Sequence, residues 1–217
     1  MRVERSKAAF ARLVISRLRR RYRHEMHTSL YHGSPWELLV ATMLSAQAQD
    51  ASVNKITPRL FRAFRGVHSY AALRPSQLYP YTRSIGLYRN KSKNIVAAAQ
   101  KITADYDAKV PDTIEGLTSL PGVGRKTANV VLYNAFHRNE GIAIDTHCIT
   151  VANRLGLART GNAAKIERTL MQVVPRKDWG DLTHLFIALG RDVCTAKKKY
   201  CVRCVLNDIC PSSTVVK

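Results

Sequence analysis

The sequence predicts an all-α fold, and three observations support this prediction. Apolar residues recur at helical spacing along most of the chain, as at Ile95, Val96, Ala99 and Ile102. No segment alternates apolar and polar residues over the length of a strand, and residues 142–144 are too short to count as one. The predicted helices are joined by connections of roughly 2–8 residues, which is typical of a compact helical array.

The N-terminal segment, residues 1–23, predicts an amphipathic helix that ends in Arg19, Arg20 and Arg21. It is basic, but it holds no uninterrupted apolar stretch and no small-residue cleavage site. A secretory signal is therefore not expected, and a mitochondrial presequence is a minor alternative.

The next two helices begin at capping signals. Ser34 caps the first helix, Pro35 fits its first position and Glu37 closes a capping box. Asp50 is the expected cap of the second helix, in which Pro58 should cause a kink or an early end.

Further helices are expected along the rest of the chain, one of them capped by Asp145. They cover residues 76–86, 92–106, 112–120, 125–136, 145–155, 162–174 and 179–194.

The composition limits the class of partner. The chain has 217 residues, 46% of them apolar, which is enough to bury one large core or two small ones. It carries 35 lysines and arginines against 15 acidic residues, a net charge of +20. Such an excess causes self-repulsion in the compact state, so we expect a polyanionic partner, with nucleic acid the first choice and a membrane surface the second. No apolar run reaches the roughly 18 residues that a bilayer-spanning helix needs.

A glycine-punctuated turn precedes the predicted helix at 125–136. Glycine permits φ > 0 and a close backbone approach, and the unpaired N–H groups at the following helix start form an anion site with the helix dipole. A phosphate is the natural ligand, and a lysine lies just beyond it. Taken alone, the same pattern also fits a plain turn between two helices. The segment consists of Leu120, Pro121, Gly122, Val123, Gly124, Arg125 and Lys126.

Four of the five cysteines lie within seventeen residues near the C-terminus. They are Cys194, Cys201, Cys204 and Cys210, separated by six, two and five residues. With no secretory signal, we expect a reducing compartment and a metal centre instead of disulfides. Structural zinc usually takes two Cys-x-x-Cys hooks, whereas here a single hook is closely flanked by the other two ligands. The spacing favours a cubane iron–sulfur cluster and leaves zinc open, and Cys148 is expected in the core.

Three lysines, Lys197, Lys198 and Lys199, lie between the first two cysteines of this group. We expect a cluster to hold this loop rigidly and to present the lysines outward. There they form a phosphate-tracking patch or only a solvated face.

Several motifs of the chain, and their order along it, resemble the endonuclease III family of the helix-hairpin-helix DNA glycosylase superfamily. The resemblance rests on residues 120–132, on Ile144-Asp145-Thr146-His147 and on the cysteine spacing. Residues 44–55 and Ile85-Gly86-Leu87-Tyr88 are similar to the family as well. The match covers roughly residues 37–210 and implies a [4Fe-4S] cluster in place of zinc.

The resemblance implies a role for each matching residue. Lys126 matches the nucleophilic lysine and Asp145 the catalytic aspartate. Gln47 matches the residue that fills the gap left by an extruded nucleotide, and Leu87 matches the wedge on the opposite strand. The turn from Leu120 to Gly124 matches the hairpin that holds the DNA backbone through its N–H groups, with Arg125 beside it, and the four cysteines match the cluster ligands.

The chemistry agrees with these roles. A base stacked in a duplex hides its sugar C1′, so the nucleotide must be flipped out and the hole filled. An amine then attacks C1′, displaces the base and forms a Schiff base, which opens the sugar to β-elimination. The helix dipole disfavours a positive charge on Lys126, and burial would act in the same direction. Asp145 either stabilises positive charge on the sugar or helps to deprotonate Lys126.

The chain departs from the family pattern at three places. The connection at residues 136–141 is longer and more polar than the family pattern predicts. Thr150 replaces a basic residue, and Gln49 stands where a small hydroxyl residue is common. None of these touches the core chemistry, but they leave the substrate preference open.

We therefore predict two helical domains flanking a DNA-binding cleft. Residues 31–138 form a central helical-barrel domain with the hairpin and Lys126, and residues 1–30 with 139–217 form a second domain with Asp145 and the iron–sulfur loop. The expected function is a bifunctional DNA glycosylase and abasic-site lyase in base excision repair, acting on oxidised pyrimidines. Its partner is double-stranded DNA with damaged bases or abasic sites, without a membrane, and we expect a cytoplasmic, nucleoid-associated monomer.

Two alternatives remain, the first from the same superfamily and the second from another functional class. A monofunctional mismatch glycosylase would remove uracil, thymine or adenine, but such relatives usually lack a lysine at position 126. The seven residues after Cys210 also leave no room for a lesion-sensing domain. A non-catalytic helix-hairpin-helix DNA-binding protein is the second alternative, and it requires Lys126 or Asp145 to be dispensable.

Overall fold

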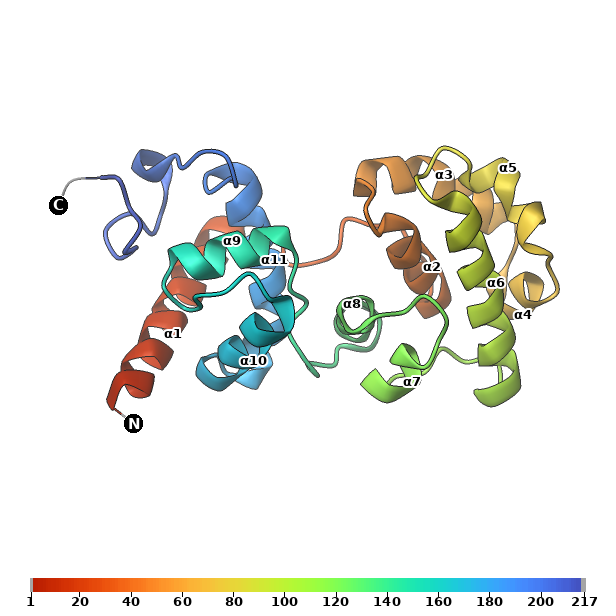
Figure 1. The fold of residues 1–217 in the computed structure, drawn as a ribbon, viewed down its shortest axis with the longest axis horizontal. Coiled ribbons are helices and arrows are strands. Elements are labelled where there is room, and N and C mark those ends of the chain that lie inside the picture. The colour runs from red at the N-terminus through yellow and green to blue at the C-terminus, as the bar shows by residue number, and fades with distance from the viewer. Residues whose placement is uncertain (1, 216–217) are drawn as a thin grey trace. The chain divides into compact units, whose positions relative to one another are not determined.

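The computed structural model describes residues 2–215, which fold entirely into helices and connecting loops (Figure 1). Within these residues the nearest approach to a sheet is an isolated antiparallel bridge between Cys194 and Lys199. The predicted all-α fold is confirmed. No helix in the described part of the chain combines the length and the apolar character that crossing a membrane requires.

The chain folds into two compact units. The central unit is Ser29–Arg138, and the terminal unit joins Met1–Thr28 with Asn139–Lys217. The sequence placed the corresponding boundaries at residues 31 and 138. Each unit has its own hydrophobic core.

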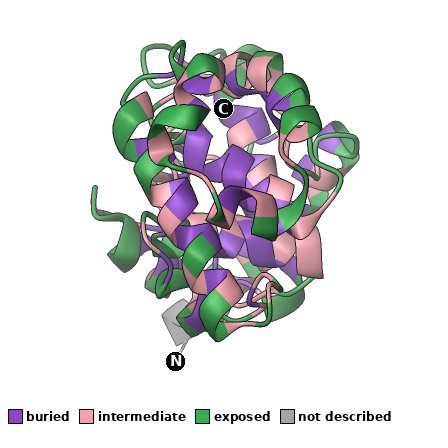
Figure 2. Cartoon of the chain, turned by 90° about the vertical axis from the view of Figure 1, so that its right-hand side faces the viewer, coloured by how far each residue is buried: buried purple, intermediate pink, exposed green. Residues whose placement is uncertain are grey.

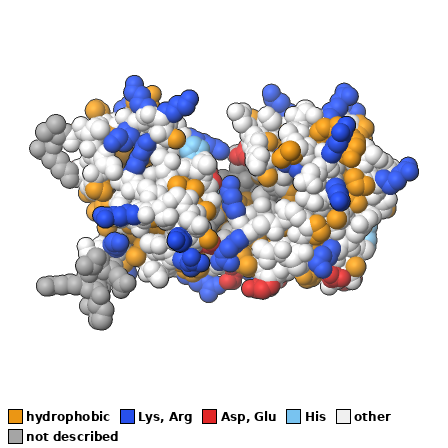
Figure 3. Space-filling view, in the orientation of Figure 1, with side chains coloured by type: hydrophobic (Ala, Val, Ile, Leu, Met, Phe, Trp, Pro, Cys, Tyr) orange, Lys and Arg blue, Asp and Glu red, His pale blue; other side chains and the backbone are white. Residues whose placement is uncertain are grey.

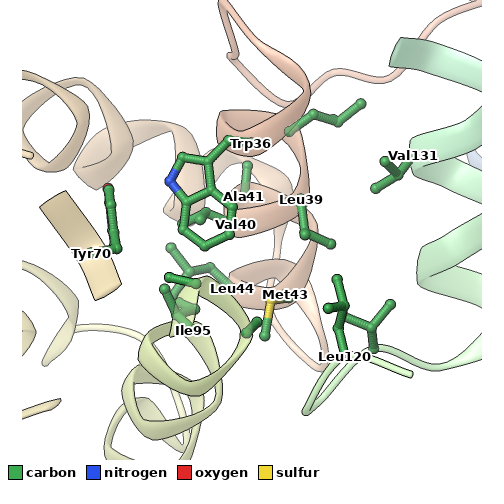
Figure 4. Close-up of a cluster of buried hydrophobic side chains, with 14 of the residues drawn as sticks. Trp36, Leu39, Val40, Ala41, Met43, Leu44, Tyr70, Ile95, Leu120 and Val131 are labelled. Atoms are coloured by element: carbon green, nitrogen blue, oxygen red, sulfur yellow. The ribbon is translucent and has the colours of Figure 1, made fainter. Parts of the chain in front are cut away.

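The core of the central unit is built around α2 (Pro35–Ser45). This helix is apolar on nearly all sides, and burying each large apolar side chain contributes about 1.5–3 kcal/mol. Figure 4 shows Tyr70 and Ile95 on one side of α2, with Leu120 and Val131 on the other. The rings of Trp36 and Tyr70 meet edge to face, with centroids 5.2 Å apart. The surrounding helices are α3 (Asp50–Ala63), α4 (Gly66–Ala71), η1 (Pro75–Leu78), α5 (Tyr79–Thr82), α6 (Tyr88–Asp105), α7 (Ile114–Thr118) and α8 (Arg125–Phe136).

The start of α2 agrees with the sequence in part. Ser34 is the cap, and its hydroxyl accepts the backbone N–H of Glu37 at 3.2 Å. The predicted capping box is wrong in its second half, because the Glu37 carboxylate accepts the N–H of Gly33, at 2.6 Å, instead of that of Ser34.

The expected cap of α3 is wrong, and of the two effects expected of Pro58 the early end is excluded. Gln49 occupies the cap position, whereas Asp50 is the first residue of the helix and accepts a hydrogen bond from the Ser29 hydroxyl at 2.7 Å. Pro58 does not end the helix, which continues to Ala63. Pro58 is exposed, while Thr57 and Leu60 beside it are buried and hold the helix against the core.

Other boundaries in the central unit shift by a few residues. The segment expected as one helix at 76–86 is η1 followed by α5, which ends at Thr82. Helix α6 begins at Tyr88, four residues before the predicted start at 92, and α7 spans only Ile114–Thr118. The sequence pattern missed α4, whereas the predicted bounds of α8 are confirmed.

The terminal unit packs around α11 (Trp179–Asp192), which contacts α1 (Arg2–Tyr22) and α9 (Thr146–Arg154). Its other helices are α10 (Ala163–Val173), η2 (Arg176–Asp178) and η3 (Cys201–Arg203). Arg19 pairs with Asp178 at 2.6 Å and also with Asp181, which ties α1 to the start of α11. Cys148 is fully buried in this core, as predicted. Figure 2 shows the general pattern, in which buried residues lie on the helix faces turned toward one another.

Candidate functional site

The glycine turn forms a hairpin between α7 and α8. The buried side chains of Leu120 and Val123 anchor it, and the N–H of Val123 donates to the carbonyl of Leu120 at 3.1 Å. Gly122 has φ +77°, the left-handed conformation that favours glycine. The sequence allowed the same conformation at Gly124, but that residue caps α8 with φ −92° and ψ 171°. Because Gly124 has no side chain, this residue makes no side-chain cap at the positive end of α8.

Lys126 lies in this first turn of α8 and is exposed. The burial that would help to neutralise its amine is therefore not provided by the folded chain itself. The exposed amine is open to a bound ligand. Arg125 beside it is exposed as well.

Asp145 is the N-cap of α9, as predicted. Its Oδ1 accepts the N–H of Cys148 at 2.8 Å, and its side chain is half-buried. The cap keeps one carboxylate oxygen bonded and orients the group at the positive end of the helix. The same helix fits closely against α11, since a β-carbon at Gly190 would lie 2.7 Å from Nδ1 of His147.

Gln47 and Leu87 share an unusual backbone conformation. Their φ values are +57° and +59°, in the left-handed region that non-glycine residues rarely adopt. Both side chains are exposed, and the large apolar side chain of Leu87 is 63% exposed. Strained residues persist where the surrounding structure enforces them, and they concentrate at functional sites. Two exposed side chains on strained backbone therefore lie in the connections that precede α3 and α6 of the central unit.

The four C-terminal cysteines line one cavity, together with Arg154 and Lys199. Arg154 holds the loop of the first cysteine: its guanidinium donates to the carbonyls of Cys194 at 3.1 Å and Thr195 at 2.8 Å, and to Sγ of Cys194 at 3.2 Å. Burial raises the pKa of the Cys204 and Cys210 thiols. Thiols in such surroundings ionise only beside a compensating positive charge, which a metal centre provides.

The arrangement of the thiols bears on the kind of centre. Among residues 2–215, no three His, Cys, Asp or Glu side chains surround one point closely enough to hold a single metal ion. The four cysteines nevertheless line the same cavity. Four thiols are the donor set of iron–sulfur clusters, and structural zinc sites use four thiols as well.

The lysine loop is only partly as expected. Lys197 and Lys198 are exposed, and the Lys198 ammonium lies 5.1 Å from the centroid of the Tyr200 ring. Lys199 was expected to point outward, but its Nζ donates to the carbonyl of Ser212 at 2.8 Å. This hydrogen bond turns Lys199 toward the C-terminal segment. On the face drawn in Figure 3, lysine and arginine side chains are spread over both units and acidic ones are few.

Sequence reasoning missed Lys91, a lysine that is 7% exposed and donates to two backbone carbonyls at the end of α2. A signal was present, because Lys91 directly precedes the predicted helix at 92–106 and lies four residues before Ile95, in line with the apolar face of that helix.

Comparisons with known proteins place the chain among DNA repair enzymes. The model of the HhH-GPD superfamily of base excision DNA repair proteins matches residues 40–176. Endonuclease III of Synechocystis is 43% identical over 85% of this chain and 84% of the relative. Endonuclease III of Bacillus subtilis is 44% identical over 83% of both chains. A solved structure of a trapped endonuclease III–DNA covalent intermediate matches with a TM-score of 0.88 and 40% identity, over 94% of this chain and 96% of that one.

Proposed function

This chain belongs to the endonuclease III family of HhH-GPD base excision DNA repair proteins, and we propose that it is a bifunctional DNA glycosylase and abasic-site lyase. Its substrates are oxidised pyrimidines in duplex DNA. The observation that carries the proposal is the exposed amine of Lys126 in the first turn of α8, directly after the hairpin. A phosphate bound at the hairpin N–H groups would set where this amine meets a sugar.

The reaction follows from an amine in that position. The neutral Nζ of Lys126 forms a bond to C1′ while the glycosidic bond breaks, and the base leaves with the bonding electrons and takes up a proton. Opening of the sugar ring leaves an iminium at C1′. Loss of a proton from C2′ then expels the 3′ phosphate with the electrons of its C–O bond, which cuts the strand. Water hydrolyses the imine and restores the lysine.

We assign the second catalytic role to Asp145. Its carboxylate is fixed by the hydrogen bond from Cys148, so it can face developing positive charge without reorganising. Gln47 and Leu87 are assigned to filling the duplex where the nucleotide has left, because both are exposed side chains held by strained backbone. Arg125, Lys197 and Lys198 would contact phosphates.

We further propose that Cys194, Cys201, Cys204 and Cys210 hold a [4Fe-4S] cluster. The cavity that the four cysteines share supports this assignment. When bound, the cluster would supply a rigid cross-link among the four cysteines, with no assigned part in base removal. We propose that one chain is sufficient for activity, because both assigned catalytic groups belong to the same chain. The proposed place of action is chromosomal DNA in the cytoplasm.

Reductive trapping tests the proposed function. The protein is incubated with duplex DNA that contains an oxidised pyrimidine, in the presence of borohydride, which reduces the iminium to a stable amine. We expect a covalent protein–DNA adduct in the wild type and in Lys165→Gln, an exposed lysine of α10, but not in Lys126→Gln. Absence of any adduct in the wild type would overturn the lyase assignment. If the protein prepared without oxygen were colourless and contained zinc, the assignment of a [4Fe-4S] cluster would be overturned.

A further inference from the structure

Lys91 is a buried lysine in the first turn of α6. Its ammonium donates hydrogen bonds to the carbonyls of Leu44 at 2.8 Å and Ala46 at 2.6 Å. Burial lowers the pKa of Lys91, because the charged form loses contact with water. A buried cation costs stability unless hydrogen bonds compensate it, and the two carbonyls provide these hydrogen bonds to Lys91.

The two acceptors belong to the end of α2. Carbonyls in the last turn of a helix lack partners within the helix, and a cation there also interacts favourably with the dipole. The N–H of Ala48 donates to the carbonyl of Ser45 at 2.9 Å and closes the turn. Gln47 lies inside this turn with its left-handed φ of +57°. The Lys91 side chain therefore fastens the turn that displays Gln47.

The backbone of Lys91 fastens the second strained residue. Its N–H donates to the carbonyl of Leu87 at 3.0 Å, and Leu87 is the N-cap of α6 with φ +59°. One residue thus holds Gln47 through its side chain and Leu87 through its main chain. All of these groups belong to the central unit, Ser29–Arg138.

We propose that Lys91 is a positioning residue that sets the spacing between Gln47 and Leu87, so that both side chains enter the DNA stack together. The proposal rests on the proposed function, which assigns these two residues to the gap left by a flipped nucleotide. Displacing a positioned group by about 1 Å can lower a rate about 100-fold. Without the hydrogen bonds from Lys91, the turn that holds Gln47 would move. The DNA with the flipped nucleotide would then be less stable, while the reaction of Lys126 with C1′ would be unchanged.

The test compares duplex and single-stranded substrates. Lys91→Met keeps the length of the side chain and removes the ammonium. We expect it to lower kcat/KM on a duplex with an oxidised pyrimidine by about 10- to 100-fold. Cleavage of a single-stranded abasic site should change by less than about twofold, because a single strand has no base stack to fill. Lys101→Met, on the same helix and paired with Asp105 on the surface, is the matched control and should resemble the wild type on both substrates.

A double-mutant cycle shows whether Lys91 acts through Gln47. Added to Gln47→Ala, the change K91M should lower duplex activity by less than about threefold, because residues that act as a unit are not additive. An equal loss on both substrates, full additivity with Gln47→Ala, or an unimpaired K91M on duplex DNA would overturn the proposal. If K91M does not fold, Lys91→Gln, a shorter neutral donor, takes its place. The ratio of its kcat/KM on duplex DNA to that on single-stranded DNA then tests the proposal, which requires this ratio to fall below the wild-type ratio. A wild type inactive on both substrates would instead refute the proposed function.

Discussion

Gly122 lies so close to Asn94 of α6 that the hairpin has no room for a side chain at this position. A β-carbon on Gly122 would lie 2.6 Å from Nδ2 and 2.8 Å from Cβ of Asn94. Around Gly124, in contrast, no heavy atom of the described residues other than its chain neighbours lies within 4 Å of such a β-carbon. The two glycines therefore meet different requirements. Gly122 is needed for packing within the central unit, and the space at Gly124 faces outward, where a DNA backbone would approach.

Substitution of the two glycines by alanine should separate folding from binding. Gly122→Ala is expected to lower the free energy of unfolding by about 1–3 kcal/mol, because it adds a clash to a left-handed backbone. Gly124→Ala should change that free energy by less than about 0.5 kcal/mol, yet weaken binding to a duplex with an abasic-site analogue. Urea unfolding and a binding titration measure the two effects. Equal stability losses in both variants would contradict the distinction.

Asp145 combines a cap and a proposed catalytic carboxylate, and asparagine separates the two roles. Asparagine caps a helix as well as aspartate does, so Asp145→Asn should leave the stability nearly unchanged, whereas Asp145→Ala should cost about 0.5–2 kcal/mol. Both variants should release bases at least about 100-fold more slowly, because the carboxylate is lost. Single-turnover base release and thermal unfolding measure this. If Asp145→Asn were fully active, capping would be the whole role of the residue.

The elements that the sequence predicted well depend on contacts close along the chain. Asp145 accepts an N–H three residues ahead, and so does Asn162, the predicted start of α10. The hairpin and α8 are likewise specified by neighbouring residues, because glycine conformation and helix periodicity are local properties. Local signals of this kind were sufficient to place the hairpin, Lys126 and the cap of α9.

The features that sequence reasoning missed depend on distant partners. Hydrogen bonds join Asp50 to Ser29, Lys91 to Leu44 and Lys199 to Ser212. No pattern in the intervening sequence predicts these pairs. The left-handed backbone of Gln47 and Leu87 was equally hidden, because that conformation is ordinarily a signal of glycine. Tertiary structure enforces it, so it became visible only with the fold.

Arg154 should be needed for the first cysteine ligand. Arg154→Met removes the donor to three consecutive carbonyls, those of Cys194, Thr195 and Ala196. We expect the free energy of unfolding to fall by about 1–3 kcal/mol and the visible absorbance of the proposed cluster to bleach faster in air. Arg203→Met is the control, because it breaks only a surface ion pair, worth about 1 kcal/mol or less, with Asp192 at 3.7 Å. Identical bleaching in both variants would show that Arg154 does not secure the ligand.

His184 of α11 should make the stability depend on pH. Burial, with a smaller contribution from His27, lowers the pKa of His184 to about 4, while Asp181 acts in the opposite direction. The unfolded chain, with a histidine pKa near 6.5, therefore binds the proton more readily between pH 6.5 and 4. The stabilising effect of a neutral His184 is complete above pH 6.5 and is lost as the pH falls toward 4.

This linkage predicts a loss of about 2 kcal/mol in the free energy of unfolding between pH 7 and pH 5. Urea unfolding at the two pH values measures it. His184→Gln should abolish most of the difference, because glutamine does not titrate, whereas His68→Gln, at an exposed position of α4, should retain it. A pH dependence that survived in His184→Gln would assign the effect to other groups.

His184 belongs to the helix that packs against α9, so its protonation would also loosen the support of Asp145. Base release at pH 5 should therefore fall less in His184→Gln than in the wild type.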